Sequence, residues 1–190
     1  MKHIVVIIVS LICACREQSD VKENEYPSSY ELKYKTGDCL YFMASDSTYG
    51  CVVVADYLKD EAGIWYGTFY TGYEARAIPT LTDVKKGKVM GRKVASAIDE
   101  LGYRSCLDGD FIHDSIFTDT NYFTLIGNIR FKGNTNPGGY GAITSMENLR
   151  VSFQKAKEFR KRPPDHYSNY LSSSGNFHPE EYFRMSDFIK

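Results

Sequence analysis

Three runs of β-branched and aromatic residues follow one another closely and constrain the fold more than any other feature. They occupy residues 38–43, 51–57 and 64–71, and turn-forming segments rich in Gly, Ser and Asp separate them. Such runs between turn signals predict three β-strands, joined as an antiparallel meander. The second run begins with CVVVA at residues 51–55, which is apolar at every position. A strand of this kind is buried on both faces, which favours a central strand or a small barrel.

Two later segments have the spacing of helices. In residues 92–101, Val94, Ile98 and Leu101 fall on one helical face, and a glycine follows as a C-terminal cap. In residues 146–162 the helix is predicted to begin after the capping residue Ser145 and to end before two prolines. Asp83 is a further candidate cap, and the cationic residues at the end of the second helix fit its C-terminal dipole.

The rest of the chain predicts shorter strands and loops. Residues 122–126 and 128–131 are predicted to form strands on either side of a glycine, whereas residues 106–120 and 133–141 are predicted to be loops. The expected fold is therefore mostly β (α+β), a small antiparallel meander or barrel-like sheet with two flanking helices. Trp65 lies mid-strand on the same side as a glycine, and we expect it to be buried in the core.

The charge balance bears on the class of partner. The chain has 190 residues, which is the length of one domain with a short appendage. Its 23 Lys and Arg against 24 Asp and Glu give a net charge of −1, whereas a protein that binds nucleic acid normally has a clear basic excess. Aromatic residues make up 14%, enough to fill a core and leave tyrosines for partner binding.

The N-terminus has the pattern of a leader. Residues 1–14, MKHIVVIIVSLICA, begin with a short positive segment and continue as an apolar run that is too short to span a membrane. Together with Cys15, the end of this run resembles the lipobox of bacterial lipoproteins, in which the cysteine receives the lipid. An ordinary secretory signal is the alternative. Arg16 follows the cysteine, which favours the outer membrane of a bacterial cell envelope by the sorting rule of enteric bacteria. The polar residues 15–31 are predicted to form a flexible tether.

The remaining cysteines are Cys39, Cys51 and Cys106. In the predicted hairpin, Met43 faces Cys51 and Cys39 faces Ala55, which puts Cys39 and Cys51 four residues out of register, about 13 Å apart. A disulfide requires Cα atoms within about 7 Å. We therefore expect buried free thiols, with a bridge from Cys106 to either one as the alternative.

The sequence contains no convincing catalytic, cofactor or metal motif. The Asp-rich segment at residues 108–114 departs from a calcium loop because its fifth position is Ile112, so we expect a polar surface turn. Cys39 and scattered histidines raise a cysteine hydrolase as an alternative, yet Cys39 begins a predicted strand rather than a helix. No nucleophile elbow, phosphate loop, zinc pattern or dinucleotide fingerprint occurs. No catalytic, cofactor-binding or metal residue is therefore predicted.

Several short motifs resemble one known family. The segment YKTGDCLYF at residues 34–42 and YGCVVV at residues 49–54 resemble the opening of the immunity protein 26 family of bacterial polymorphic toxin systems. The segment YFTLIGNI at residues 122–129 resembles the closing strand of that family, with Phe123 where Trp is commoner. The likeness covers about residues 32–131.

Membership of that family would imply a mostly β domain that binds and neutralises a cognate protein toxin, without catalysis. Residues 79–120 have no counterpart in the family pattern. The sequence thus predicts a leader (1–14), a tether (15–31) and one β-rich domain (32–190) with a helical C-terminal extension. The expected function is that of a noncatalytic binding protein attached to the membrane by lipid on Cys15, with a glycan- or peptide-binding envelope module as the alternative.

Overall fold

A computed structural model describes most of the domain. The described residues are 31–95, 103–118, 122–133, 137–159 and 177–190. The predicted leader lies outside them, as does the predicted tether except for its last residue, Glu31. The chain divides into two compact units, Met1–Leu32 and Lys33–Lys190, and every described helix and strand belongs to the second.

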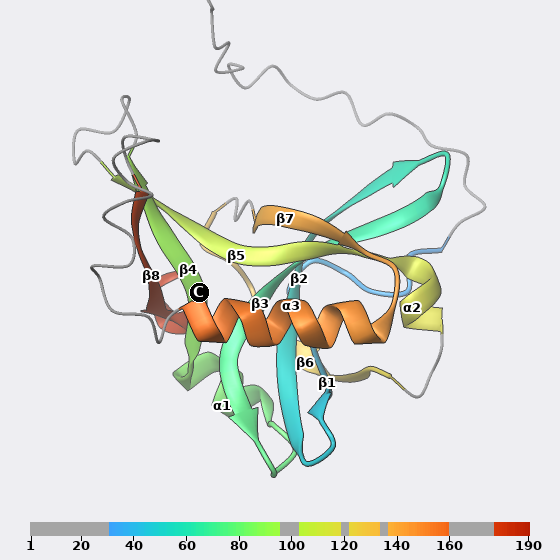
Figure 1. Cartoon of the computed structure of the whole chain (residues 1–190), viewed down its shortest axis with the longest axis horizontal. Coiled ribbons are helices and arrows are strands. Elements are labelled where there is room, and N and C mark those ends of the chain that lie inside the picture. The colour runs from blue at the N-terminus through green and yellow to red at the C-terminus, as the bar shows by residue number, and fades with distance from the viewer. Residues whose placement is uncertain (1–30, 96–102, 119–121, 134–136, 160–176) are drawn as a thin grey trace, which may run out of the picture. The chain divides into compact units, whose positions relative to one another are not determined.

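Within the described residues, eight strands form one open mixed sheet (Figure 1). The strands are β1 (Asp38–Ser45), β2 (Thr48–Asp60), β3 (Gly63–Ala75), β4 (Lys88–Ala95), β5 (Tyr103–His113), β6 (Thr124–Asn128), β7 (Pro137–Ile143) and β8 (Phe177–Arg184). Their order is β6-β1-β2-β3-β4-β5-β7, and β8 pairs with β4. All pairs are antiparallel except β5–β7. The predominantly β class is confirmed, but the small meander or barrel is not.

Four helical segments accompany the sheet in the described part of the chain: α1 (Leu81–Lys86), α2 (Asp114–Thr118), α3 (Met146–Phe159) and the 3-10 helix η1 (Met185–Asp187). Helix α3 lies across one face of the sheet (Figure 1). It was predicted from its start at residue 146, and the Ser145 hydroxyl caps it by accepting the backbone N–H of Asn148 at 3.2 Å. The last three residues of the predicted helix, 160–162, lie outside the described residues.

The predicted helix at residues 92–101 is wrong over its described part. Residues up to Ala95 belong to β4, which pairs with β5 along one edge and with β8 along the other. Residues 96–102 lie outside the described part of the chain. The apolar spacing is compatible with either structure, and pairing on two edges decides for the strand. Asp83 is not the cap itself, because Thr80 caps α1 and Asp83 returns the bond to the Thr80 backbone N–H.

Both predicted loops contain regular structure. The segment predicted as the first loop forms most of β5 and the whole of α2, and the second contains the start of β7. The hairpin register also differs from expectation. Cys39 lies opposite Val53 and Met43 opposite Tyr49, because the turn between β1 and β2 is shorter than predicted.

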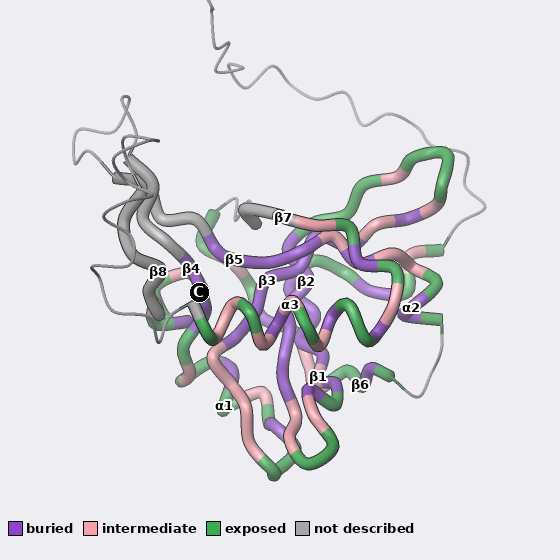
Figure 2. Tube along the Cα trace, viewed as in Figure 1, coloured by how far each residue is buried: buried purple, intermediate pink, exposed green. Residues whose placement is uncertain are grey.

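Each face of the sheet has its own core. The core beneath α3 is largely aromatic and contains Phe42, Tyr66, Tyr70, Phe117, Phe123, Leu149 and Phe153. The core on the other face contains Cys39, Cys51, Val53, Ala55, Phe69, Val84, Val89, Leu107, Ile129, Met185 and Ile189. The buried stretches run through the middle of the strands in Figure 2, whereas the turn between β2 and β3 is exposed. Both cores consist wholly of residues from the second compact unit.

Candidate functional site

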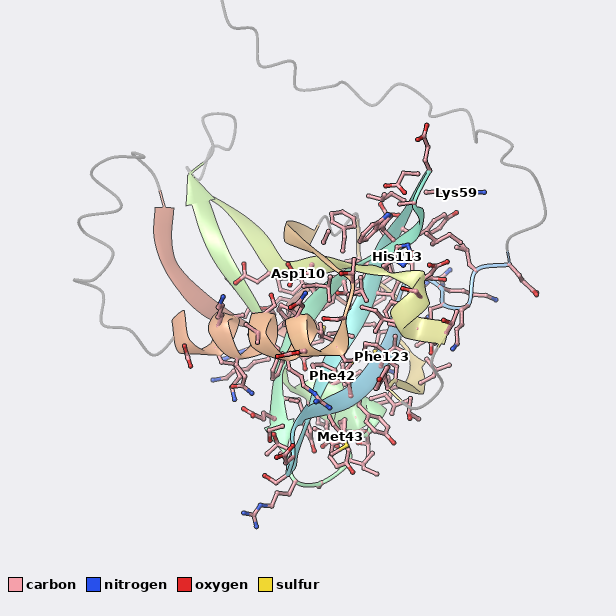
Figure 3. All side chains as sticks on the ribbon, turned by 45° about the vertical axis from the view of Figure 1, so that its right-hand side comes forward. Phe42, Met43, Lys59, Asp110, His113 and Phe123 are labelled. Atoms are coloured by element: carbon pink, nitrogen blue, oxygen red, sulfur yellow. The ribbon has the colours of Figure 1, made fainter. Side chains whose placement is uncertain are left out.

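The hairpin of β2 and β3 extends beyond the strand that flanks it. Strand β1 pairs with β2 only as far as Val53, so the outer part of β2 pairs with β3 alone. Figure 1 shows this hairpin projecting past the rest of the sheet. We call residues 56–65 the β2–β3 arm. Lys59 lies on the arm and His113 near its base in Figure 3.

One carboxylate organises the turn of the arm. The Asp60 Oδ1 atom accepts the backbone N–H groups of Ala62 at 2.8 Å and Gly63 at 3.2 Å, and the Trp65 indole N–H at 3.0 Å. Gly63 has a φ of +139°, a conformation that L side chains rarely adopt. A Cβ atom there would lie 2.8 Å from His113 Nε2. The turn therefore requires both the aspartate and the glycine.

The arm is also attached to β5 at its base. Trp65 lies opposite His113, and their rings pack edge to face with centroids 4.7 Å apart. His113 Nε2 lies 2.9 Å from the Ala62 carbonyl oxygen, and its Nδ1 lies 2.7 Å from the Ser115 hydroxyl. These contacts hold the indole in one orientation before any partner arrives.

Trp65 is only half-buried, so its predicted place in the core is wrong. Its neighbour across the hairpin is Leu58, which is itself exposed, and the arm extends past the edge of the sheet.

The arm exposes apolar side chains that have acidic side chains around them. Tyr57 is 47% exposed and Leu58 is 41% exposed, on opposite faces of the hairpin. Asp56, Asp60 and Glu61 are exposed beside them. Exposed apolar side chains with a polar rim are typical of protein-binding surfaces, and Tyr and Trp are enriched there. We call the side chains of Asp56, Tyr57, Leu58, Asp60, Glu61 and Trp65 the arm surface.

Cys39 and Cys51 are not placed for nucleophilic catalysis. Cys39 and Cys51 are free and fully buried, as predicted, although they are two residues out of register rather than four. Burial, with a contribution from the Asp38 charge, raises the pKa of Cys39 to about 12. Burial and the neighbouring Cys39 raise the pKa of Cys51 as well. A catalytic cysteine needs the opposite shift, toward the thiolate. The side chain of Cys106 lies outside the described part.

The Asp-rich segment is not the predicted surface turn, because Asp108 and Asp110 are buried in β5. Asp110 Oδ2 accepts hydrogen bonds from the Tyr70 and Ser152 hydroxyls, which join β3, β5 and α3 (Figure 3). Burial and the Asp110 charge raise the pKa of Tyr70. Sequence reasoning missed this network because Asp-Gly-Asp is typical of turns. Gly109 is required instead because β5 passes so close to the Thr68 carbonyl of β3 that a side chain would clash.

A second polar contact fastens α3 to β3. The Glu74 carboxylate accepts from Gln154 Nε2 at 3.0 Å and from Thr48 Oγ1 at 3.1 Å, and it forms an ion pair with Lys157. Lys157 belongs to the basic end of α3, whose cations were expected to fit the helix dipole. Lys155 of the same end is exposed, and its remaining residues, 160–162, lie outside the described residues.

Among the described residues, no group of three or more His, Cys, Asp and Glu side chains is arranged to hold a metal ion. None of the helices described here is long and apolar enough to cross a membrane. Cys15, the predicted site of lipid attachment, lies outside the described residues. Neither a protein-family model, nor a curated protein, nor a solved structure matches this chain.

Proposed function

We propose that this chain is a noncatalytic protein-binding domain, attached to the bacterial cell envelope by lipid on Cys15, and that it acts as an immunity protein. The arm surface is the observation that carries this proposal. Its apolar side chains are exposed, and the bonds around Asp60 and His113 hold Trp65 in place. Such pre-organisation lowers the entropic cost of binding.

The charges of the arm specify the chemistry of the partner. Three carboxylates surround the exposed Tyr57 and Leu58, and Lys59 is the one cation among residues 56–65. Opposite charges across an interface raise the association rate and select the partner. The partner surface is therefore a protein surface with an apolar recess and basic side chains around it. In the proposed role this surface belongs to a toxin that the resemblance to the immunity protein 26 family implies.

The immunity role is tested by growth rescue. A toxin gene is first sought beside the gene of this chain, and cells that express it should grow when the chain is co-expressed and stop growing without it. The variant Leu58→Asp should lose rescue. Val151→Asp, on α3, introduces the same charge at a residue that is 46% exposed and should keep rescue. Absence of rescue by the folded wild-type chain, or full rescue by Leu58→Asp, would contradict the proposal.

The glycan- or peptide-binding alternative gives a different result. Trp65 is the single tryptophan of the chain, so its fluorescence reports on the arm. A shift of that fluorescence on addition of muropeptides, without growth rescue, would favour the envelope module. The hydrolase alternative predicts muropeptide release that disappears in Cys39→Ser, whereas the buried thiol predicts no release by either protein.

The lipid anchor is tested by metabolic labelling with an alkynyl fatty acid. Cys15→Ser should abolish labelling and leave the precursor uncut, because a hydroxyl does not accept the lipid. Cys13→Ser is the matched control and should label like wild type, since it keeps a small residue before the cleavage site. Persistent label in Cys15→Ser, or loss of label in Cys13→Ser alone, would contradict the lipobox assignment and the proposed outer-membrane location.

A further inference from the structure

Seven cationic side chains gather from three segments that are far apart in the sequence. They are Lys85, Lys86, Lys88, Arg130, Lys132, Arg184 and Lys190, which we call the basic face. All seven are exposed, although the chain as a whole has a net charge of −1. This concentration of charge has no part in the arm surface or in either core.

Backbone contacts bring the three segments together. Lys88 lies directly opposite Arg184 in the β4–β8 pair, and the Met185 N–H donates to the Gly87 carbonyl at 3.1 Å. The Lys190 N–H donates to the Arg130 carbonyl at 2.7 Å, and the Lys132 N–H donates to the Phe188 carbonyl at 2.9 Å. The end of α1, the segment after β6 and the C-terminal segment therefore form one continuous surface.

Buried and exposed side chains alternate along these segments, so the cationic side chains face the solvent. Phe131 packs against Phe69 of the core and bridges to Ile189, which is buried. Three of the four neighbours of these two residues are Arg130, Lys132 and Lys190, and all three are exposed. Lys132 Nζ also donates to the Ser186 carbonyl at 2.8 Å, a neutral acceptor that leaves its positive charge in place.

Few carboxylates offset these cations. Asp83 and Asp187 are the acidic side chains of residues 81–88, 130–132 and 184–190. The Asp83 carboxylate is already engaged by the Thr80 N–H at 2.8 Å and the Thr80 hydroxyl at 2.6 Å. Within these three segments, seven cationic side chains stand against two acidic ones, which gives the segments an excess of positive charge.

We propose that the basic face binds anionic lipid headgroups and holds the domain against the bilayer. Each Lys or Arg near an anionic membrane strengthens binding about fivefold. The choice of a membrane rests on the lipid anchor proposed above, since a tether of this length keeps the domain close to the bilayer. Nucleic acid is the less favoured polyanion because the whole chain is nearly neutral.

The turn of the arm and α1 lie at opposite ends of the sheet in Figure 1, so a domain bound through its basic face presents the arm away from the membrane.

The test measures vesicle binding without the anchor. A chain that begins at Arg16 lacks the leader and Cys15 but retains the compact unit that contains both cores. It is mixed with vesicles of phosphatidylcholine alone or of equal parts of phosphatidylcholine and phosphatidylglycerol, and sedimentation separates bound from free protein. We expect binding to the anionic vesicles that falls as salt is added, and none to the neutral vesicles.

Charge reversal locates the binding surface. Lys85→Glu with Lys86→Glu should weaken binding to the anionic vesicles by about 25-fold or more, as two fivefold losses. Lys35→Glu with Lys155→Glu changes the net charge equally at two exposed residues outside the basic face, and it should weaken binding by less than about threefold. Circular dichroism and thermal melting confirm that both variants are folded.

Three results would overturn the proposal: equal binding to neutral vesicles, equal weakening by both double variants, or tighter binding to a DNA duplex than to the anionic vesicles. The truncated chain carries neither Cys15 nor a toxin. A failure of vesicle binding is therefore distinct from a failure of lipid labelling or of growth rescue.

Discussion

The two faces of the sheet are built from different chemistry. Under α3, the aromatic core contains a buried carboxylate, Asp110, that receives two hydroxyl hydrogen bonds from β3 and α3. On the other face the core consists of aliphatic, aromatic and thiol side chains, and its hydrogen bond from Thr71 to the Cys51 carbonyl joins neutral groups. Hydrogen bonds are directional whereas apolar burial is not. Hydrogen bonds therefore orient α3 on one face of the sheet, whereas the burial of apolar area stabilises the other face.

The largest effects should come from removing one ring on each face. Phe153→Ala under α3 and Phe69→Ala on the opposite face should each lower the free energy of unfolding by about 3–5 kcal/mol, because both rings are fully buried. Urea denaturation followed by circular dichroism measures the change. A much smaller loss for Phe153→Ala than for Phe69→Ala would mean that α3 unfolds separately from the sheet.

The next largest effect should come from removing the hydrogen bond between Tyr70 and Asp110, compared with the neutral hydrogen bond of Thr71. Tyr70→Phe should cost about 1.5–3 kcal/mol, since it removes a buried hydrogen bond to a carboxylate. Thr71→Val, the matched change on the other face, removes a bond between neutral groups and should cost about 1 kcal/mol. Equal losses in urea denaturation would contradict the distinction between the two faces.

Trp65→Ala tests the arm, which neither face covers. The cost should be about 2 kcal/mol, less than for a fully buried aromatic residue, because part of the indole is exposed. In the folded wild-type chain, acrylamide should quench the Trp65 fluorescence readily. Weak quenching together with a loss as large as that of Phe69→Ala would place the indole in the core after all.

The stability of the face of the sheet that contains Cys39 and Cys51 should fall at alkaline pH. Cys39 keeps its proton in the folded chain, where its pKa is about 12, but ionises in the unfolded chain above its ordinary value of 9.0. Its contribution to stability is therefore intact below pH 9 and is lost as the pH rises toward 12. By about pH 10 the loss from Cys39 should be about 1.4 kcal/mol.

Comparing denaturation of wild type and Cys39→Ala between pH 8 and pH 10 measures this loss, and the variant should show a shallower decline. Iodoacetamide provides an independent check, because Cys39 and Cys51 should be alkylated only after unfolding. An identical decline in both proteins, or rapid alkylation of the folded chain, would contradict the raised pKa of Cys39.

Local sequence patterns were sufficient to predict the elements whose own residues carry strand, turn or capping signals. The first three strands and α3 were predicted because β-branched runs end at turn residues and because Ser145 precedes a helical pattern. The strands β5 and β7 were missed because their sequences are rich in Gly and Asp. The pairing of β5 with both β3 and β7 compensates for this weak local preference.

The candidate site was less accessible to sequence reasoning. Tyr57 and Leu58 were predicted only as the end of a strand, since nothing in their pattern indicates that β1 stops before reaching them. Trp65 was expected in the core because side-chain alternation specifies a face but not whether that face is covered. The basic face is invisible in the sequence because its cations come from segments distant along the chain.

The sequence by itself determined the mostly β class, the three leading strands, the start of α3 and the burial of two free thiols. Each of these follows from neighbouring residues, whose backbone preferences and apolar periodicity act over a few positions. The tertiary structure alone decided that residues up to Ala95 form a strand, that Asp110 is buried, and that Trp65 is only half-buried. These outcomes depend on which segment lies alongside, and pairing and burial energies between distant segments exceed the local preferences that a sequence displays.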